Sequence, residues 1–206
     1  MQHIVDTKNK TALPSLNLRH DLQKSLDRQH IDPSALSIFQ RILLTTDGTV
    51  TDILEAYLFE QIQVVKLSEQ LALLDYDLPI MNLKEGTEAI IRKVLLQGRI
   101  SQKNFIYADS IIIPERLNEE FRVSLLNTKV PIGRLWFEQR VETFKEILEF
   151  SREPAGDLAN HFNIQLSENL LSRTYCVFSN QKPVKMITEK FPENFFWRVF
   201  NSILPN

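Results

Sequence analysis

Short runs of apolar residues, several with alternating polar positions, occupy much of the second half of the chain, a pattern typical of strands. Residues 87–114 contain two runs rich in Ile, Val, Phe and Tyr on either side of a polar link at 98–104. Each run is too short for a typical capped amphipathic helix, so the segment predicts a β-hairpin. Residues 170–178 and 184–191 predict a second hairpin, joined through 179–183.

Helical spacing and capping residues predict the elements that surround these hairpins. Helices are expected over 16–30, 33–44 after the capping residue Asp32, 50–59 after Thr49, 115–127, 157–162 and within the tail 192–206. Residues 61–67 predict one more strand, 71–83 are expected to be irregular, and 141–150 fit a helix and a strand equally well. Residues 1–13 are expected to form a loose arm. Together these elements predict an α+β fold, a mostly antiparallel sheet covered by helices, in a single domain over 1–206.

Composition narrows the class of protein. The chain has 206 residues, of which 43% are hydrophobic and 24% charged, as is ordinary for a soluble globular domain. Its formal net charge of −2 gives no basic field for a nucleic-acid partner. No apolar run reaches the roughly 18 residues of a membrane span, and the N-terminus lacks the apolar core of a signal peptide. The lone Cys176 excludes an internal disulfide and a cysteine-based zinc site. Together these points suggest a cytoplasmic protein. We also expect a monomer.

Two charged residues interrupt apolar rows on the predicted strands. Arg92 shares a strand face with Ile90, and Glu189 lies on its strand face between Ile187 and Phe191. One interpretation leaves both in water, with Arg92 on an edge strand and Glu189 at an exposed strand end. In the other both face inward, where they neutralise each other or flank a pocket for an anion with a hydroxyl or ether oxygen opposite. These alternatives stay open on the sequence alone.

Familiar cofactor and metal motifs are missing from the sequence. The four histidines lack ligand spacing, and no dinucleotide-binding GxGxxG, P-loop or GxSxG motif occurs. We therefore expect no metal and no cofactor.

Four segments together resemble the chorismate pyruvate-lyase family, in particular its cyanobacterial and plastid branch. They are LLTTDGTVTDILEAY (43–57), IIRKVLLQG with YADSIIIP (90–98 and 107–114), KVPIGRLWF (129–137) and SNQKPVKMITEKFP (179–192). They occur in the family's order. The combination of an arginine-bearing strand, a PxGR turn and a glutamate-bearing final hairpin carries the resemblance.

The resemblance implies an α+β domain with an enclosed internal site. It implies that this site splits chorismate into 4-hydroxybenzoate and pyruvate without metal or cofactor. The 4-hydroxybenzoate would supply the synthesis of a quinone such as plastoquinone. The resemblance implies that Arg92 holds the ring carboxylate and that Glu189 faces the 4-oxygen of the ring. It also implies that the backbone N–H groups of Ile132 and Val50 meet the carboxylate. Arg134 and Lys185 are candidates for the enolpyruvyl carboxylate, with a structural role as the alternative for both.

Two departures from the family pattern and two competing functions complete the prediction. Val50 stands where the best-known bacterial enzymes carry methionine, and Asp109 and Ser110 replace a glycine-arginine pair.

A small-molecule sensor is the first competing function, because the same fold class forms effector domains of some bacterial transcription regulators. An interaction scaffold is the second, and it requires Arg92 and Glu189 to be exposed and more than about 10 Å apart.

Overall fold

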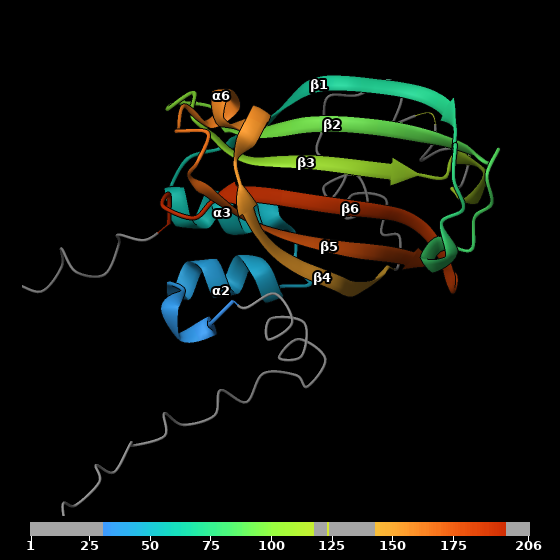
Figure 1. Cartoon of the computed structure of the whole chain (residues 1–206), viewed down its shortest axis with the longest axis horizontal. Helices are drawn as coiled ribbons and strands as arrows, with labels where there is room; N and C mark the ends of the chain where they lie inside the picture. Colours follow the sequence, from blue (N-terminus) through green and yellow to red (C-terminus); the bar gives the residue numbers. More distant parts are fainter. Residues whose placement is uncertain (1–30, 118–122, 124–142, 197–206) are drawn as a thin grey trace, which may run out of the picture.

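An antiparallel sheet of six strands forms the body of the protein in the computed structural model, which describes residues 31–117, 123 and 143–196. The strands are β1 (Ile62–Leu73), β2 (Glu88–Gly98), β3 (Asn104–Ile112), β4 (Phe144–Pro154), β5 (Asn169–Ser179) and β6 (Lys182–Pro192). Their order across the sheet is β1-β2-β3-β6-β5-β4, and every neighbouring pair is antiparallel (Figure 1). Both predicted hairpins and the predicted α+β class are confirmed.

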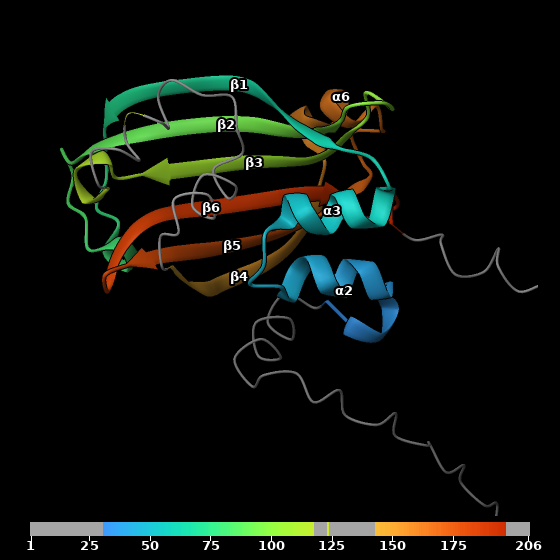
Figure 2. The same ribbon diagram turned by 180° about the vertical axis from the view of Figure 1, so that it is seen from behind.

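Helices cover both faces of the sheet at one end. The helical elements are η1 (Pro33–Ala35), α2 (Ile38–Thr45), α3 (Val50–Leu58), η2 (Pro79–Met81), η3 (Pro114–Arg116), η4 (Gly156–Leu158) and α6 (Ala159–Phe162). Helices α2 and α3 lie side by side over one face, and α6 lies on the opposite face (Figures 1 and 2). We call the face under α2 and α3 the helix-covered face. None of the helices that the structure describes has the length and apolar character of a membrane span.

The predicted helix over 33–44 is divided in two. Asp32 caps its start as predicted, since its Oδ1 accepts from the Ser34 backbone N–H at 2.8 Å, but only a 3-10 turn follows. A second start signal then takes over, because the Ser37 and Gln40 side chains each accept from the other's backbone N–H in a capping box. Helix α3 begins at Val50 as predicted, although the Thr49 side chain makes no capping bond.

Two strands that the sequence pattern did not define each contain a β-bulge. Strand β1 extends to Leu73, so the expectation of irregular structure from residue 71 was wrong there. A register shift between Lys66 and Ser68 changes which side chains face inward and hides the alternation. The ambiguous segment 141–150 contributes strand β4, which has a similar shift between Ile147 and Glu149.

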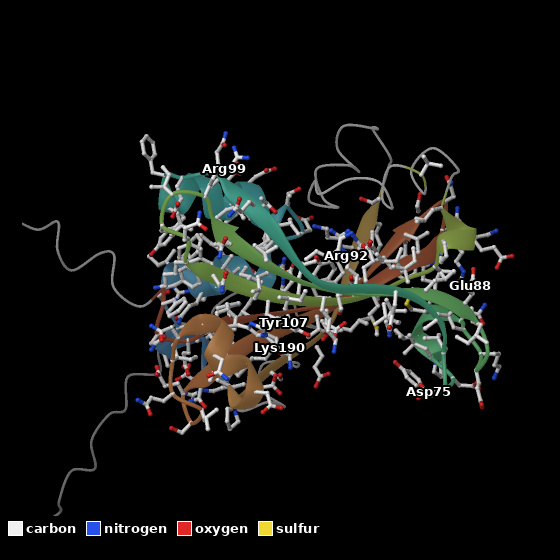
Figure 3. All side chains as sticks on the ribbon, turned by 90° about the horizontal axis from the view of Figure 1, so that it is seen from above. Asp75, Glu88, Arg92, Arg99, Tyr107 and Lys190 are labelled. Carbon is white, nitrogen blue, oxygen red and sulfur yellow. The ribbon has the colours of Figure 1, made fainter. Side chains whose placement is uncertain are left out.

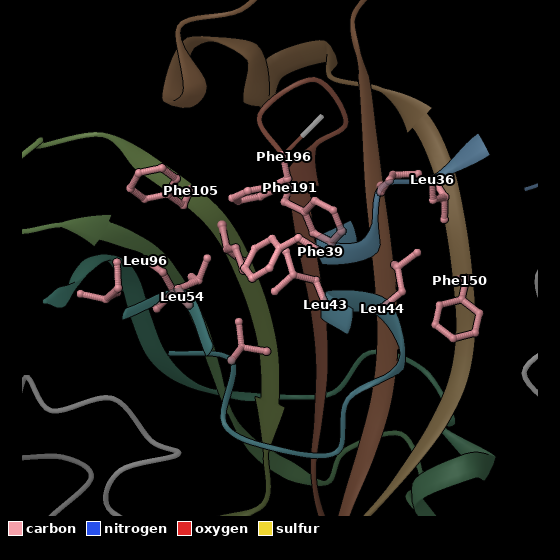
Figure 4. Close-up of a cluster of buried hydrophobic side chains, with 14 of the residues drawn as sticks. Leu36, Phe39, Leu43, Leu44, Leu54, Leu96, Phe105, Phe150, Phe191 and Phe196 are labelled. Atoms are coloured by element: carbon pink, nitrogen blue, oxygen red, sulfur yellow. The ribbon is translucent and has the colours of Figure 1, made fainter. Parts of the chain in front are cut away.

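The main hydrophobic core lies between α2, α3 and the helix-covered face (Figure 4). The sheet contributes Leu96, Ile106, Phe150, Leu171 and Phe191, and the helices contribute Phe39, Leu43, Leu44 and Leu54. The Phe39 and Tyr57 rings stack with their centroids 3.6 Å apart. This core fills one end of the helix-covered face, and the charged side chains lie next to it along the strands.

Several predicted elements fall outside the described residues. They are the arm over 1–13, the helix over 16–30, most of the helix over 115–127, the PxGR turn within 129–137 and the end of the tail after residue 196. Ile132 and Arg134 belong to this group.

Candidate active site

Strand register gathers the buried charged residues on the helix-covered face. Residues directly opposite each other in antiparallel strands point to the same face. One row across the sheet contains Glu69, Arg92, Ser110, Ile187 and Tyr175. The row on one side of it contains Ala108, Glu189, Arg173 and Phe150. The row on the other side contains Ile112, Lys185, Val177 and Lys145. We call the set Glu69, Arg92, Lys145, Arg173, Tyr175, Lys185 and Glu189 the polar cluster.

Arg92 is buried, with 2% of its surface exposed. Its Nε lies 3.4 Å from Oε2 of Glu69, whose Oε1 also accepts from Lys66 Nζ at 2.5 Å. Within the described part of the chain, Nε and NH1 of Arg92 have no hydrogen-bond acceptor. Strand β2 lies between β1 and β3, so the edge-strand interpretation of Arg92 was wrong. Figure 3 shows Arg92 on one side of the sheet, with Tyr107 and Lys190 on the other.

Burial lowers the pKa of the Arg92 guanidinium, and the nearby Glu69 carboxylate raises it. An arginine nonetheless keeps its proton in proteins. The side chain therefore presents a fixed positive charge with unused donors in the protein interior. Such a group is suited to binding a carboxylate, whose two oxygens match the planar fork of the guanidinium.

Glu189 is also buried, with 7% of its surface exposed, so the interpretation as an exposed strand end was wrong. Arg173 Nε donates to its Oε2 at 2.8 Å, and the Tyr175 hydroxyl donates to its Oε1 at 2.9 Å. Arg92 and Glu189 thus have different ion partners and do not neutralise each other. Because both are buried, the scaffold hypothesis, which requires them to be exposed, is contradicted.

Two lysines extend the polar cluster along the strands. Burial and the neighbouring Lys145 lower the pKa of Lys185 to about 7, against an opposing effect of Glu189. Lys145 Nζ donates to the Gly48 carbonyl at 2.7 Å, and burial lowers its pKa as well. The cluster therefore combines several cations with few carboxylates in a place where water is largely excluded.

Helix α3 begins beside the polar cluster. Arg173 NH1 donates to the Thr46 carbonyl at 2.6 Å, and Lys145 donates to Gly48, so the loop before α3 is tied to β4 and β5. The first intrahelical bond of α3 runs from Ile53 N–H to the Thr49 carbonyl, which leaves the N–H of Val50 free of an intrahelical acceptor. The contact predicted for Val50 therefore has a donor close to the cluster.

Ser110 occupies the position directly opposite Arg92. Its hydroxyl donates to the Arg92 carbonyl at 3.3 Å, and its side chain is buried. Asp109 points to the opposite face of the sheet because neighbouring strand residues alternate. Strand β3 therefore supplies no cation at either departure from the family pattern.

Comparison with known proteins gives the family. Residues 44–198 match the family described as chorismate pyruvate-lyase Rv2949c-like. The chain belongs to this family. The chorismate pyruvate-lyase of Mycobacterium leprae is 32% identical over 161 residues, which cover 76% of this chain and 75% of that protein. That of Mycobacterium tuberculosis strain H37Rv is 26% identical over 162 residues, which cover 76% and 80%.

Solved structures with the same fold are more distant from this lyase-family chain in sequence. The effector domain of PhnF from Mycobacterium smegmatis has a TM-score of 0.59 and 7% identity, over 74% of this chain and 93% of that one. The C-terminal domain of the histidine utilization repressor from Pseudomonas syringae pv. tomato has a TM-score of 0.51 and 9% identity, over 71% and 100%. At these identities the likeness shows a shared fold alone.

The sequence prediction missed Glu69, Lys145, Arg173 and Tyr175. A signal for Arg173 was present, since it interrupts the apolar row of Leu171 and Val177 as Arg92 interrupts its own. Glu69 and Lys145 were missed because each lies on a strand that contains a bulge, and the bulge breaks the alternation of apolar and polar residues.

Proposed function

We propose that this protein is a chorismate lyase that converts chorismate into 4-hydroxybenzoate and pyruvate, by an elimination that makes the ring aromatic and uses no cofactor. The observation that carries the proposal is the buried Arg92, which has unused donors on the same sheet face as the buried Glu189. Membership of a chorismate pyruvate-lyase family supports it.

Arg92 binds the ring carboxylate in this proposal. Its unused Nε and NH1 donors give a charge-assisted contact to the carboxylate oxygens. The backbone N–H of Val50, at the start of α3, adds a donor without adding a charged group. The N–H of Ile132 completes the predicted contacts.

Glu189 faces the 4-oxygen of the ring and accepts a hydrogen bond from its hydroxyl. Arg173 and Tyr175 donate to its two oxygens, which fixes the orientation of the carboxylate and leaves further lone pairs for a ligand. Aromatisation drives the cleavage, so the protein contributes mainly by holding the substrate and stabilising the charge that develops.

The test is to mix purified protein with chorismate and to follow 4-hydroxybenzoate by absorbance and pyruvate in a coupled assay, without added metal. We expect equal amounts of both products. Arg92→Met and Glu189→Gln should each lose most of the activity. Lys93→Met is the matched control, because Lys93 is the exposed neighbour of Arg92 on the opposite sheet face. No turnover by the wild-type protein, or full turnover by Arg92→Met, overturns the proposal.

The sensor hypothesis makes a different prediction in the same assay. Binding of chorismate or 4-hydroxybenzoate without turnover would favour it. The regulator domains named above share only the fold with this chain, so they give no support to a sensor function here.

Several finer statements stay predictions. They are the cyanobacterial and plastid branch, the supply of a plastoquinone precursor, an enclosed site within one domain over the whole chain, a cytoplasmic location and a monomeric state. Size-exclusion chromatography with light scattering tests the last of these.

A further inference from the structure

Arg173 is held more rigidly than an ordinary counter-ion requires. It is 1% exposed, its Nε donates to Glu189 and its NH1 donates to the Thr46 carbonyl. Its guanidinium carbon also lies 5.0 Å from the centre of the Tyr175 ring. These contacts fix the plane of the guanidinium and therefore the direction of its remaining group, NH2.

That remaining NH2 group is buried and has no hydrogen-bond acceptor within the described part of the chain. A buried donor without an acceptor is unfavourable and uncommon in folded proteins, so it calls for an explanation. A pure structural partner for Glu189 leaves the NH2 group unexplained. A ligand with an anionic group explains it.

Arg92 and Arg173 lie on opposite sides of the strands that would carry the substrate. Arg92 comes from β2 and Arg173 from β5, with β3 and β6 between them. Arg173 contacts Glu189 directly, which places it at the 4-oxygen end of a ring whose carboxylate is at Arg92. In chorismate the enolpyruvyl ether is on C3, next to C4, so the second carboxylate of the substrate belongs at this end.

We propose that Arg173 is a second substrate-binding residue, which binds the carboxylate of the enolpyruvyl group through its unused NH2. This inference rests on the proposed lyase function. It assigns one arginine to each carboxylate of a dianionic substrate, and it gives Arg173 a part in the departure of pyruvate.

The chemistry of the leaving group agrees with this assignment. The C3–O ether bond breaks, its electron pair goes to the enolpyruvyl oxygen, and C4 loses a proton as the ring becomes aromatic. A proton returned to the methylene carbon of the enolate gives pyruvate, so chorismate dianion yields two monoanions. A cation at the carboxylate of the leaving group stabilises the negative charge that develops there.

Two ligands that differ by one carboxylate test the role of Arg173. The first is 4-hydroxybenzoate, and the second is 3-(carboxymethoxy)-4-hydroxybenzoate, a stable compound with an added ether-linked carboxylate. Isothermal titration calorimetry measures both against wild type, Arg173→Lys and Arg173→Met. Arg173→Lys retains a cation for Glu189 while removing the NH2 group, and it decides the question if Arg173→Met does not fold.

We expect wild type to bind the dicarboxylate at least tenfold more tightly than 4-hydroxybenzoate, and both variants to lose this preference. A change in the affinity for 4-hydroxybenzoate alone reports the contact of Arg173 with Glu189, so the ratio of the two affinities is the quantity that tests the second carboxylate site. Equal weakening of the two ligands, or no weakening of either, overturns the inference, because Arg173 would then act only through Glu189 or not at all.

Failure of this inference can be told apart from failure of the lyase function. A wild-type protein that turns chorismate over but does not prefer the dicarboxylate refutes the role of Arg173 alone. A protein that prefers the dicarboxylate through Arg173 but does not cleave chorismate supports the second carboxylate site and refutes the lyase.

Discussion

Replacement of Arg92 by methionine should separate stability from activity. Methionine approximates the length of the side chain without its charge, and Arg92 is almost fully buried. Removal of the guanidinium removes two buried donors that have no acceptor among the described residues, each of which costs about 1–3 kcal/mol. It also removes the attraction of Glu69 at 3.4 Å, which is about 5 kcal/mol at an effective dielectric constant of about 20.

These opposing effects nearly cancel. We therefore expect Arg92→Met to change the free energy of unfolding by no more than about 2 kcal/mol, whereas breaking a fully satisfied buried ion pair costs about 3–5 kcal/mol. The loss of the carboxylate contact should weaken transition-state binding by about 2–5 kcal/mol, which lowers kcat/KM for chorismate roughly 30- to 5,000-fold.

Urea unfolding and steady-state turnover of chorismate measure the two quantities on the same protein. Lys93→Met is the control, because it also removes one positive charge from β2 but at an exposed position. The double variant Glu69→Gln with Arg92→Met should be more stable than Arg92→Met, because it no longer buries an unpaired carboxylate oxygen. A loss of more than about 3 kcal/mol in stability with normal turnover would show that Arg92 is a structural residue.

Three further predictions concern other contacts. Lys185 has a folded-state pKa of about 7 against an ordinary 10.5, so the unfolded state binds more protons between these values and wild type gains stability as pH rises through them. Lys185→Met should remove this gain and stabilise the protein more at pH 6 than at pH 9 in urea unfolding; equal effects at both would contradict it. Tyr175→Phe should lower the free energy of unfolding by about 1.5–3 kcal/mol, since a hydrogen bond to Glu189 is lost; no change in the urea midpoint would contradict that bond. Ser37→Ala should cost about 1 kcal/mol in thermal unfolding, and Thr49→Ala clearly less, because the Ser37 side chain makes a capping bond and the Thr49 side chain does not.

The regular parts of the fold could be predicted from the sequence, and the bulged parts could not. In the two hairpins the register shifts lie near the turns, between Leu96 and Gln97 and between Val177 and Phe178, so the period of two was visible along the rest of each strand. In β1 and β4 a bulge shifts the alternation, near Lys66 and near Ile147, and each half then fits a different pattern. The turn between β5 and β6 is also tighter than predicted, since Asn180 and Gln181 alone connect the strands with positive φ of 49° and 61°.

The candidate site shows the same division. Arg92 and Glu189 were singled out as candidates because a charge in an apolar row is visible along one strand, but the rows left open whether either side chain is buried. Their partners Glu69 and Arg173 were not identified, because the sequence does not give the register that places Glu69 opposite Arg92 and Arg173 opposite Glu189. The contact between β3 and β6 joins segments far apart in the chain, and no local pattern encodes it.

The placement of Glu69 on β1 links the arginine anchor to the margin of the sheet. Within the described residues β1 pairs with β2 alone, and its bulge immediately precedes Glu69. A marginal strand detaches at lower free energy than a central one, because fewer backbone bonds hold it. Local opening of β1 would remove Glu69 from Arg92 while the remaining strands stay paired, so in the proposed function carboxylate binding at Arg92 would depend on the stability of this outer strand.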